Sequence, residues 1–331
     1  MSPAGAPVVI LIGPRPTVRL SLMTVQVKGS ETPANRERGA AVRVATSDVS
    51  IWASVKRIWV SRELLVALTR KELKVKYKDS VLGFAWSLLN PALNLAVFYV
   101  VFSIFLKNGI PNFALWLLCG ILIWNFISVV LPGATGSVVA NSGLVKKVPF
   151  PREILPLASI GSGLVHFFLQ SSVLIVAVVA LQQGVAWSFL PLVPIAILAM
   201  ILLAAAVGVF MAAINVQVRD AQHLLELLLL AWFWLTPIVY PYRQVSDRAA
   251  AHGLPQSFLM IINPITPVIT VFQRVFYNRV SVHAGTLPLL PERGVLWYGT
   301  FVVASAVGSF ILLIVSLHVF ARLEGKFAEE L

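Results

Sequence analysis

Side chains able to bind anionic groups cluster ahead of the first long apolar segment of this 331-residue chain. On a helical wheel Arg70, Lys74 and Lys78 fall within about 80° of one another, and Lys71 directly follows Arg70. A basic face of this kind binds phosphate groups when its helix lies on a membrane surface. The pattern predicts an amphipathic interfacial helix over residues 51–80, which serves either as a topology anchor or as a contact for an anionic lipid-linked substrate.

A second charged group follows a long apolar stretch. Gly143 and the pair Pro149 and Pro151 bracket a short helix that carries Lys146 and Lys147. A short, rigid, basic helix is well suited to docking onto a cytoplasmic partner. An ordinary positively charged cytoplasmic loop is the alternative.

Aromatic side chains form the third group, on two apolar segments. Four of them share about 120° of a helical wheel, and the others lie in a later segment. Such rings contact lipid in most membrane proteins, and they also stack on the C–H faces of sugars without burying polar groups. The aromatic residues are Phe98, Tyr99, Phe102, Phe105, Trp232, Phe233, Trp234 and Tyr240.

Residues for catalysis or metal binding are not grouped in the sequence. The five histidines show no ligand spacing, and one cysteine, Cys119, excludes an intrachain disulfide. His166, one turn before Gln170, is interpreted as a hydrogen-bonding residue between helices. No Gly-x-x-x-x-Gly-Lys phosphate loop occurs in the sequence, so we expect no catalytic residue, no metal and no cofactor in this chain.

The composition decides the class of protein. Apolar residues make up 58% and charged residues 12% of the chain, whereas soluble domains average about 45–50% and about 25%. A soluble enzyme is therefore excluded. The net charge of +12 is concentrated in residues 1–80, which hold 14 of the 26 Lys and Arg residues. This asymmetry favours an anionic membrane surface over nucleic acid as the partner.

Hydropathy and the positions of helix-breaking residues predict an all-α membrane protein with six transmembrane helices. Residues 1–50 are predicted to be a disordered tail, and residues 81–331 a six-span transmembrane domain. Residues 241–294 are predicted to form short external helices, because repeated Gly and Pro would break a lipid-exposed span. The six spans are predicted at residues 84–106, 113–135, 154–181, 191–214, 223–240 and 296–320.

The distribution of Lys and Arg predicts the orientation. With the N-terminus inside, 14 of these residues near the spans are cytoplasmic and 6 are external. Because basic loops stay in the cytoplasm, both termini are predicted to be cytoplasmic.

Four strings, taken together, resemble the permease subunit of ABC-type polysaccharide exporters. They are Arg70–Pro91, Lys147–Pro156, Val218–Asp220 and Leu235–Pro241, and the resemblance covers residues 54–320. It implies a multi-pass subunit of the inner (plasma) membrane with the type-2 exporter fold, including a coupling helix and external gate helices. Its partners would be a second copy of itself, two ATPase subunits that hold ATP and Mg, and a polyprenyl-linked polysaccharide.

The resemblance also implies roles for particular residues. The eight aromatic residues named above are expected to line the pore, and Arg70, Lys71, Lys74 and Lys78 to face lipid headgroups. The residues expected to couple to the ATPase are Lys146, Lys147, Phe150, Arg152, Glu153, Arg219 and Asp220.

The substrate is constrained less tightly. Arg outnumbers Lys by 16 to 10, and Ala, Val and Leu are the most frequent apolar residues. A gene of high GC content often produces this composition. Combined with the resemblance, this favours a cell-wall galactan precursor, with O-antigen and teichoic acid as the other glycans. A permease for small hydrophobic molecules or lipids is the alternative function. An integral-membrane glycosyltransferase or acyltransferase is the third hypothesis, and the sparse carboxylates give it little support.

Overall fold

The computed structural model describes residues 51–78, 83–105, 107, 109–278 and 289–331. All regular structure in these residues is helical, which confirms the prediction of an all-α membrane protein. The tail predicted over residues 1–50 lies outside the described residues, as does the stretch 279–288 within the predicted external region.

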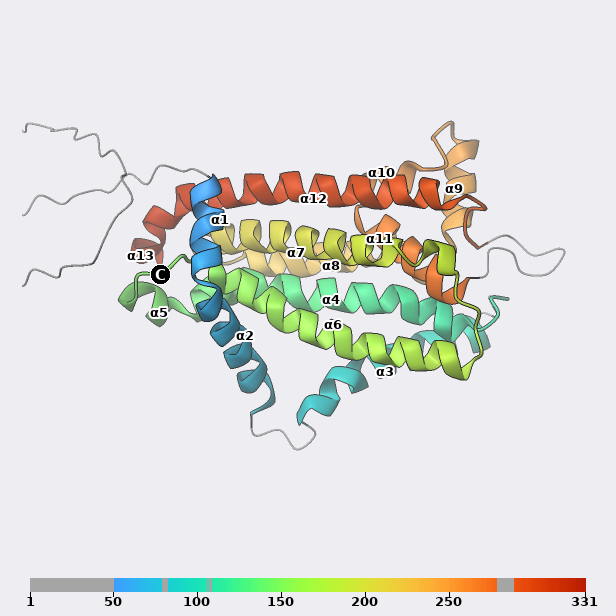
Figure 1. Ribbon diagram of the computed structural model, residues 1–331, viewed down its shortest axis with the longest axis horizontal. Helices are drawn as coiled ribbons and strands as arrows, with labels where there is room; N and C mark the ends of the chain where they lie inside the picture. The colour runs from blue at the N-terminus through green and yellow to red at the C-terminus, as the bar shows by residue number, and fades with distance from the viewer. Residues whose placement is uncertain (1–50, 79–82, 106, 108, 279–288) are drawn as a thin grey trace, which may run out of the picture. The chain divides into compact units, whose positions relative to one another are not determined.

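Five helices are long and apolar enough to cross a bilayer. They fall on the segments expected for spans one, two, three, four and six. In Figure 1, α4, α6, α7 and α12 run alongside one another, and α7 packs extensively on both α4 and α12. The five are α3 (Trp86–Tyr99) with its π-helical continuation η3 (Val100–Phe105), α4 (Phe113–Ala140), α6 (Ile154–Ala180), α7 (Leu192–Gln217) and α12 (Val295–Leu323).

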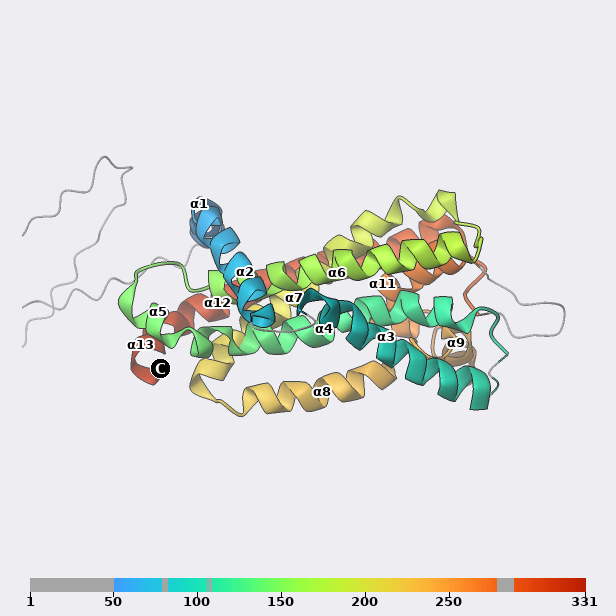
Figure 2. The ribbon, with the colours of Figure 1, turned by 90° about the horizontal axis from the view of Figure 1, so that it is seen from below.

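The segment expected for span five forms a shorter helix, α8 (Ala221–Leu235). Its 15 residues extend about 22 Å, less than the bilayer core of about 30 Å. The helix ends because Thr236 precedes Pro237 and adopts an extended backbone conformation, as residues before proline prefer. Figure 2 shows α8 alongside α4. The count of six spans therefore stays a prediction.

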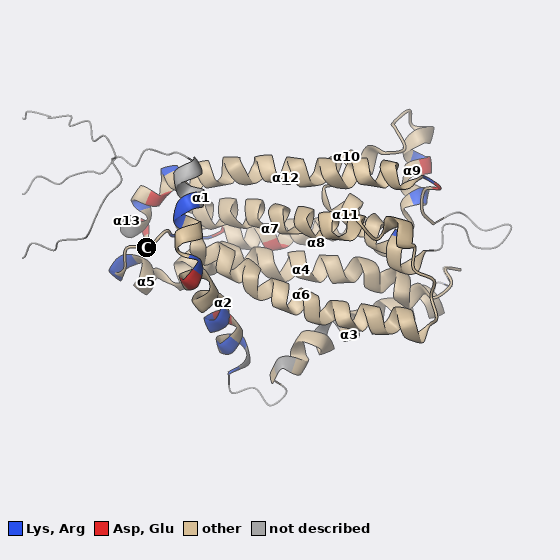
Figure 3. Ribbon diagram, viewed as in Figure 1, with Lys and Arg blue, Asp and Glu red and all other residues tan. Residues whose placement is uncertain are grey.

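One end of the bundle carries most of the described Lys and Arg residues (Figure 3). We call it the basic end. A smaller charged group lies at α9, near the opposite ends of the long helices. This distribution is the one on which the predicted orientation rests. The helices of the basic end are α1 (Ile51–Val60), α2 (Arg62–Tyr77), α5 (Ser142–Lys147) and α13 (Phe327–Glu330).

Short helices fill the region between α8 and α12. All eight residues of α11 are buried, and this helix packs against α4, α7 and α12. Because α11 is buried, the irregular backbone beside it is surrounded by protein and not by lipid. A break in a membrane helix requires such protein surroundings. The short elements are α9 (Tyr242–Ala251), α10 (Phe258–Ile262), α11 (Ile265–Phe272) and the π-helical η5 (Gln273–Tyr277).

Two glycines permit close contact between helices. A Cβ atom on Gly208 of α7 would lie 2.9 Å from the Cβ atom of Ala134 on α4. A Cβ atom on Gly161 of α6 would lie 2.8 Å from Oγ1 of Thr69, at the point where α2 crosses α6. Small residues at these crossings allow the dense packing that holds membrane helices together.

Candidate functional site

The basic helix α5 presents its two lysines at the surface. Lys146 and Lys147 are exposed at its C-terminal turn, where cations also interact favourably with the helix dipole. Val145 is buried beneath them and anchors the helix. Phe150, in the loop that follows, is half-buried against the same apolar cluster. The segment thus presents two charged side chains at the surface of a helix that buried apolar residues hold in place.

Arg152 and Glu153, also expected to couple to the ATPase, are engaged within the chain. The Arg152 guanidinium donates a hydrogen bond to the main-chain carbonyl of Glu324 and lies over the ring of Phe327. The Glu153 side chain is fully buried, and its Oε1 lies 3.4 Å from Nη2 of Arg57. These contacts fasten α1 and the C-terminal helices to the start of α6, so both side chains support the surface that α5 presents.

Arg219 and Asp220 lie in the turn between α7 and α8, and both are exposed. Nearby on α8, Nδ1 of His223 lies 4.0 Å from Oε2 of Glu226. The turn is a second exposed, charged element within the described chain.

The predicted lipid-facing residues Arg70, Lys71, Lys74 and Lys78 are all exposed on α2 or at its end. Lys71 also donates a hydrogen bond of 2.9 Å from Nζ to Oδ1 of Asn141, at the start of α5. Helix α2 is therefore joined directly to the start of α5, the helix that carries the exposed lysines.

The opposite side of α2 carries a half-buried carboxylate. Glu72 accepts hydrogen bonds from Oγ of Ser159, at 2.9 Å, and from Oγ of Ser162, at 3.1 Å. Burial raises the pKa of Glu72, and the hydroxyls and the nearby Lys71 and Lys76 oppose that shift. Partial burial lowers the pKa of Lys76, against the effect of Glu72.

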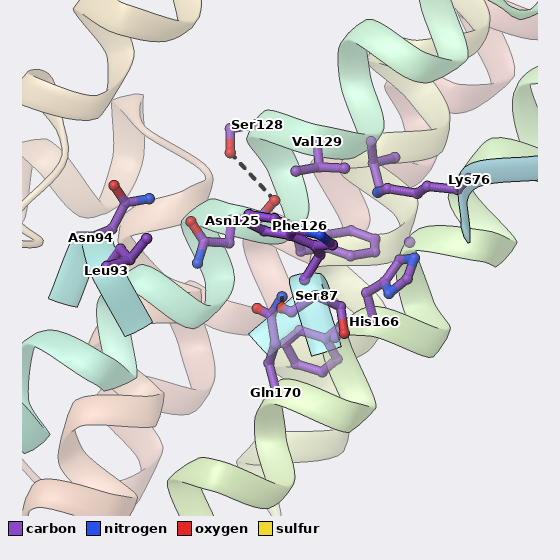
Figure 4. A pocket seen from close by; sticks show the side chains of 14 residues that line it. Lys76, Ser87, Leu93, Asn94, Asn125, Phe126, Ser128, Val129, His166 and Gln170 are labelled. Atoms are coloured by element: carbon purple, nitrogen blue, oxygen red, sulfur yellow. Dashed lines mark hydrogen bonds between the residues drawn. The ribbon is translucent and has the colours of Figure 1, made fainter. Parts of the chain in front are cut away.

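A cavity of about 500 Å³ lies between α2, α3, α4 and α6. Figure 4 shows Lys76 reaching into it from α2 at one end, Asn94 of α3 at the other end, and Asn125 of α4 between them. Its apolar walls include aromatic rings. Its polar lining consists of Lys76, Ser87, Asn94, Asn125, Ser128, His166 and Gln170.

A second cavity, of about 440 Å³, lies between α3, α4 and α8. It shares Asn94, Asn125 and Ser128 with the first cavity, so the two hollows meet at this polar corner. Its walls are mostly apolar. Volumes of this size are typical of small-molecule sites, in which apolar walls surround a few placed polar groups.

Three of the aromatic residues predicted to line the pore line this second cavity: Phe98, Phe233 and Trp234. The ring centroids of Phe98 and Phe233 are 5.6 Å apart. Trp124 of α4 completes the wall, with its ring 5.4 Å from that of Phe233. The rings come from three helices and form one continuous surface.

The other predicted aromatics lie elsewhere. Tyr99 lines a separate hollow beside the start of α4, and Phe105 is exposed. Phe102 packs on Phe113, with ring centroids 6.2 Å apart. The Tyr240 hydroxyl donates a hydrogen bond to the main-chain carbonyl of Trp234.

Trp232, the remaining aromatic, is held by a buried asparagine. Its indole N–H donates a 3.0 Å hydrogen bond to Oδ1 of Asn263, which also accepts from the main-chain N–H of Ile265. Nδ2 of Asn263 donates to Oγ1 of Thr236, at 2.9 Å. Asn263 thereby connects the end of α8 to the start of α11.

Other polar residues fit structural roles. Gln170 donates a hydrogen bond of 3.0 Å to the main-chain carbonyl of Ser87, which joins α6 to α3 as expected of a polar residue between helices. Within the ranges that the structure describes, no group of three His, Cys, Asp or Glu side chains is placed to hold a metal ion.

Asn94, Asn125 and Trp124 were not predicted as site residues. For the two asparagines the signal was present, because polar side chains inside an apolar span mark functional positions. Their convergence depends on how α3 and α4 pack, and the sequence pattern of either helix alone does not contain that information.

Comparisons with known proteins agree with this architecture. Residues 63–277 match the family model described as ABC-2 type transporter. The chain is 31% identical over 277 residues to the O-antigen export system permease protein RfbA of Myxococcus xanthus, covering 84% of this chain and 98% of the relative. It is 30% identical to a protein of the same name from Klebsiella pneumoniae, over 81% and 94% of the two chains.

A more distant similarity, 22% identity over 63% of this chain and 80% of the relative, links it to the polysialic acid transport protein KpsM of Escherichia coli. The matched region runs from α2 through both cavities to the end of η5. The chain belongs to the ABC-2 type transporter family and is an integral membrane permease subunit of that family.

Proposed function

We propose that this chain is the transmembrane subunit of an ATP-driven exporter that moves a lipid-linked polysaccharide out of the cytoplasm. The observation that carries the proposal is the pair of joined cavities, lined largely by amides, hydroxyls and aromatic rings, with Lys76 in the first cavity and Glu226 in the second. Neutral hydrogen-bonding groups beside flat rings are suited to sugars, which present hydroxyls at their edges and C–H groups on their faces. The names of the relatives, for O-antigen export and polysialic acid transport, support the same class of cargo.

The energy source in this proposal is a separate ABC ATPase, which binds ATP and Mg. The exposed Lys146 and Lys147 on α5 and the turn at Arg219 and Asp220 are the surfaces proposed to contact it. Because Glu153 is buried against Arg57, we assign it, together with Arg152, to supporting the position of α5.

Two copies of the chain and two ATPase subunits form the proposed assembly, in the inner membrane with both termini in the cytoplasm. The apolar stretch of α3 and η3 supports a partner at its exposed face, because no side chain described in it is fully buried within the chain. The preferred cargo is a cell-wall galactan precursor on a polyprenyl carrier, with O-antigen and teichoic acid as the other glycans. A permease for small hydrophobic molecules is less favoured, since it has no need of the polar corner between the cavities.

Export by the reconstituted complex tests the proposal. With the ATPase partner and a polyprenyl-linked glycan in proteoliposomes, glycan should reach the opposite side only when ATP is supplied. Trp234→Ala should slow export about tenfold while ATP hydrolysis continues, because the second cavity loses one wall. Trp187→Ala is the matched control, since Trp187 is exposed in the connection between α6 and α7 and lines neither cavity. ATP-dependent export of hydrophobic dyes without glycan export would contradict the proposal.

A further inference from the structure

The corner where the two cavities meet contains an amide group without a partner. Nδ2 of Asn125 is buried, and within the described structure no hydrogen-bond acceptor lies in reach of it. Asn94 faces the same corner from α3, and Lys76 lines the far end of the first cavity. Lys76 also interacts with Glu72, whereas no group of the described structure satisfies the Asn125 amide.

An unpaired amide donor in a membrane interior is costly, because lipid offers no acceptor. A ligand that supplies an oxygen acceptor at this place recovers the lost hydrogen bond. Asparagine amides are neutral, so they match hydroxyl and ether oxygens without requiring a counter-charge. The rings of Phe126 and Phe167 form part of the same wall and offer faces to a sugar.

The charge of the first cavity is confined to one end. Lys76 is its one ionised lining residue in the described structure, beside Glu72 on the same helix and near His166 of α6. A cation at one end of the cavity and amides toward the other suit a headgroup with two parts, a phosphate followed by a sugar.

We infer that Asn125 and Asn94 bind the sugar unit next to the phosphate of a lipid-linked glycan whose phosphate lies at Lys76. The inference rests on the proposed function and adds to it a recognition site for the first sugar, ahead of the aromatic wall. The cargo then passes from the polar first cavity to the aromatic second cavity at the residues that both share.

Binding measurements on the purified permease–ATPase complex in nanodiscs test this assignment. The probes are polyprenyl diphosphate without sugar, polyprenyl diphosphate carrying a disaccharide, and a water-soluble sugar phosphate. Asn125→Leu should weaken binding of the disaccharide lipid about fivefold to tenfold, the value of one net hydrogen bond, and leave the sugar-free lipid unaffected. Lys76→Gln should weaken binding of both lipids. Binding of the soluble sugar phosphate as tight as that of the disaccharide lipid would overturn the lipid-linked source.

Ser171→Ala is the matched control, because its hydroxyl donates to the main-chain carbonyl of Phe167 and lines neither cavity. If Asn125→Leu does not assemble, Asn94→Leu removes the facing amide and should show the same selective loss. An equal loss of affinity for both lipids, or no loss, would overturn the inference. The proposed function would still stand in that case, provided that the wild-type complex exports glycan. A wild-type complex that binds neither lipid would overturn both.

Discussion

Glu72 lies where α2 crosses α6, and its carboxylate is enclosed by groups from both helices. Ser159 and Ser162 donate hydrogen bonds to it from α6, while Lys71 and Lys76 lie near it on α2. Burial is the largest influence and raises its pKa above the usual value of 4.5. A protonated Glu72 therefore favours the packing of α2 against α6.

This shift predicts a pH-dependent stability. Since the pKa is higher in the folded protein than in the unfolded chain, the stabilisation is complete below the unfolded-state pKa and is lost as pH rises through the raised value. In Glu72→Gln the melting temperature should fall less between acidic and neutral pH than in the wild type. Glu63→Gln, exposed on the same helix, is the control. Melting curves with equal pH dependence in Glu72→Gln and the wild type would refute the assignment.

Individual residues also mark the limit of prediction from sequence. The exposure of Lys146 and Lys147 follows from their charge and their place beside a proline-bounded turn. The burial of Glu153 does not follow, because its neutralising partner Arg57 lies on a helix far away in the sequence. Likewise, Asn125 was visible as a polar residue in a span, but its meeting with Asn94 is a product of tertiary packing.

At the scale of elements, α8 and α11 depend on one another. The sequence indicated the interruption at Thr236 and Pro237, and the helix does end there. It did not indicate what covers the interrupted backbone. Asn263 does so from the start of α11, by bonding Trp232, Thr236 and the main chain of Ile265 at once.

Asn263→Ala is expected to lower the free energy of unfolding by about 1–3 kcal/mol, because it leaves the donors of Trp232 and Ile265 unpaired in a buried place. Trp232→Phe removes a single bond and keeps most of the ring, so its effect should be smaller. Detergent-induced unfolding of the purified protein measures both. A larger loss in Trp232→Phe than in Asn263→Ala would show that the ring, rather than the asparagine, holds this junction.

At the scale of the whole molecule, composition and hydropathy were sufficient for the class. Long apolar runs predict membrane helices because the bilayer requires them, and five such helices are present in the described chain. The lengths of α8 and of the short helices between α8 and α12 were less predictable. These elements contact other parts of the protein where a longer span would contact lipid, and the periodicity of one segment does not reveal such contacts.

The basic end predicts a measurable orientation. Cys119 is fully buried, so single cysteines introduced elsewhere report with little background. Lys146→Cys should react with a membrane-impermeant maleimide only from the cytoplasmic side. Arg293→Cys, exposed before α12, should react only from outside. Reaction of position 146 from outside in intact cells would reverse the proposed topology.

The brevity of α8 has a consequence for the surrounding membrane. A helix of 15 residues falls short of a bilayer core of about 30 Å, whereas the neighbouring α4 exceeds it. If α8 is the predicted fifth span, lipid beside it would thin to match, and this deformation has an elastic cost that depends on acyl-chain length. The conformational free energy of this subunit would thus depend on bilayer thickness as well as on nucleotide and cargo.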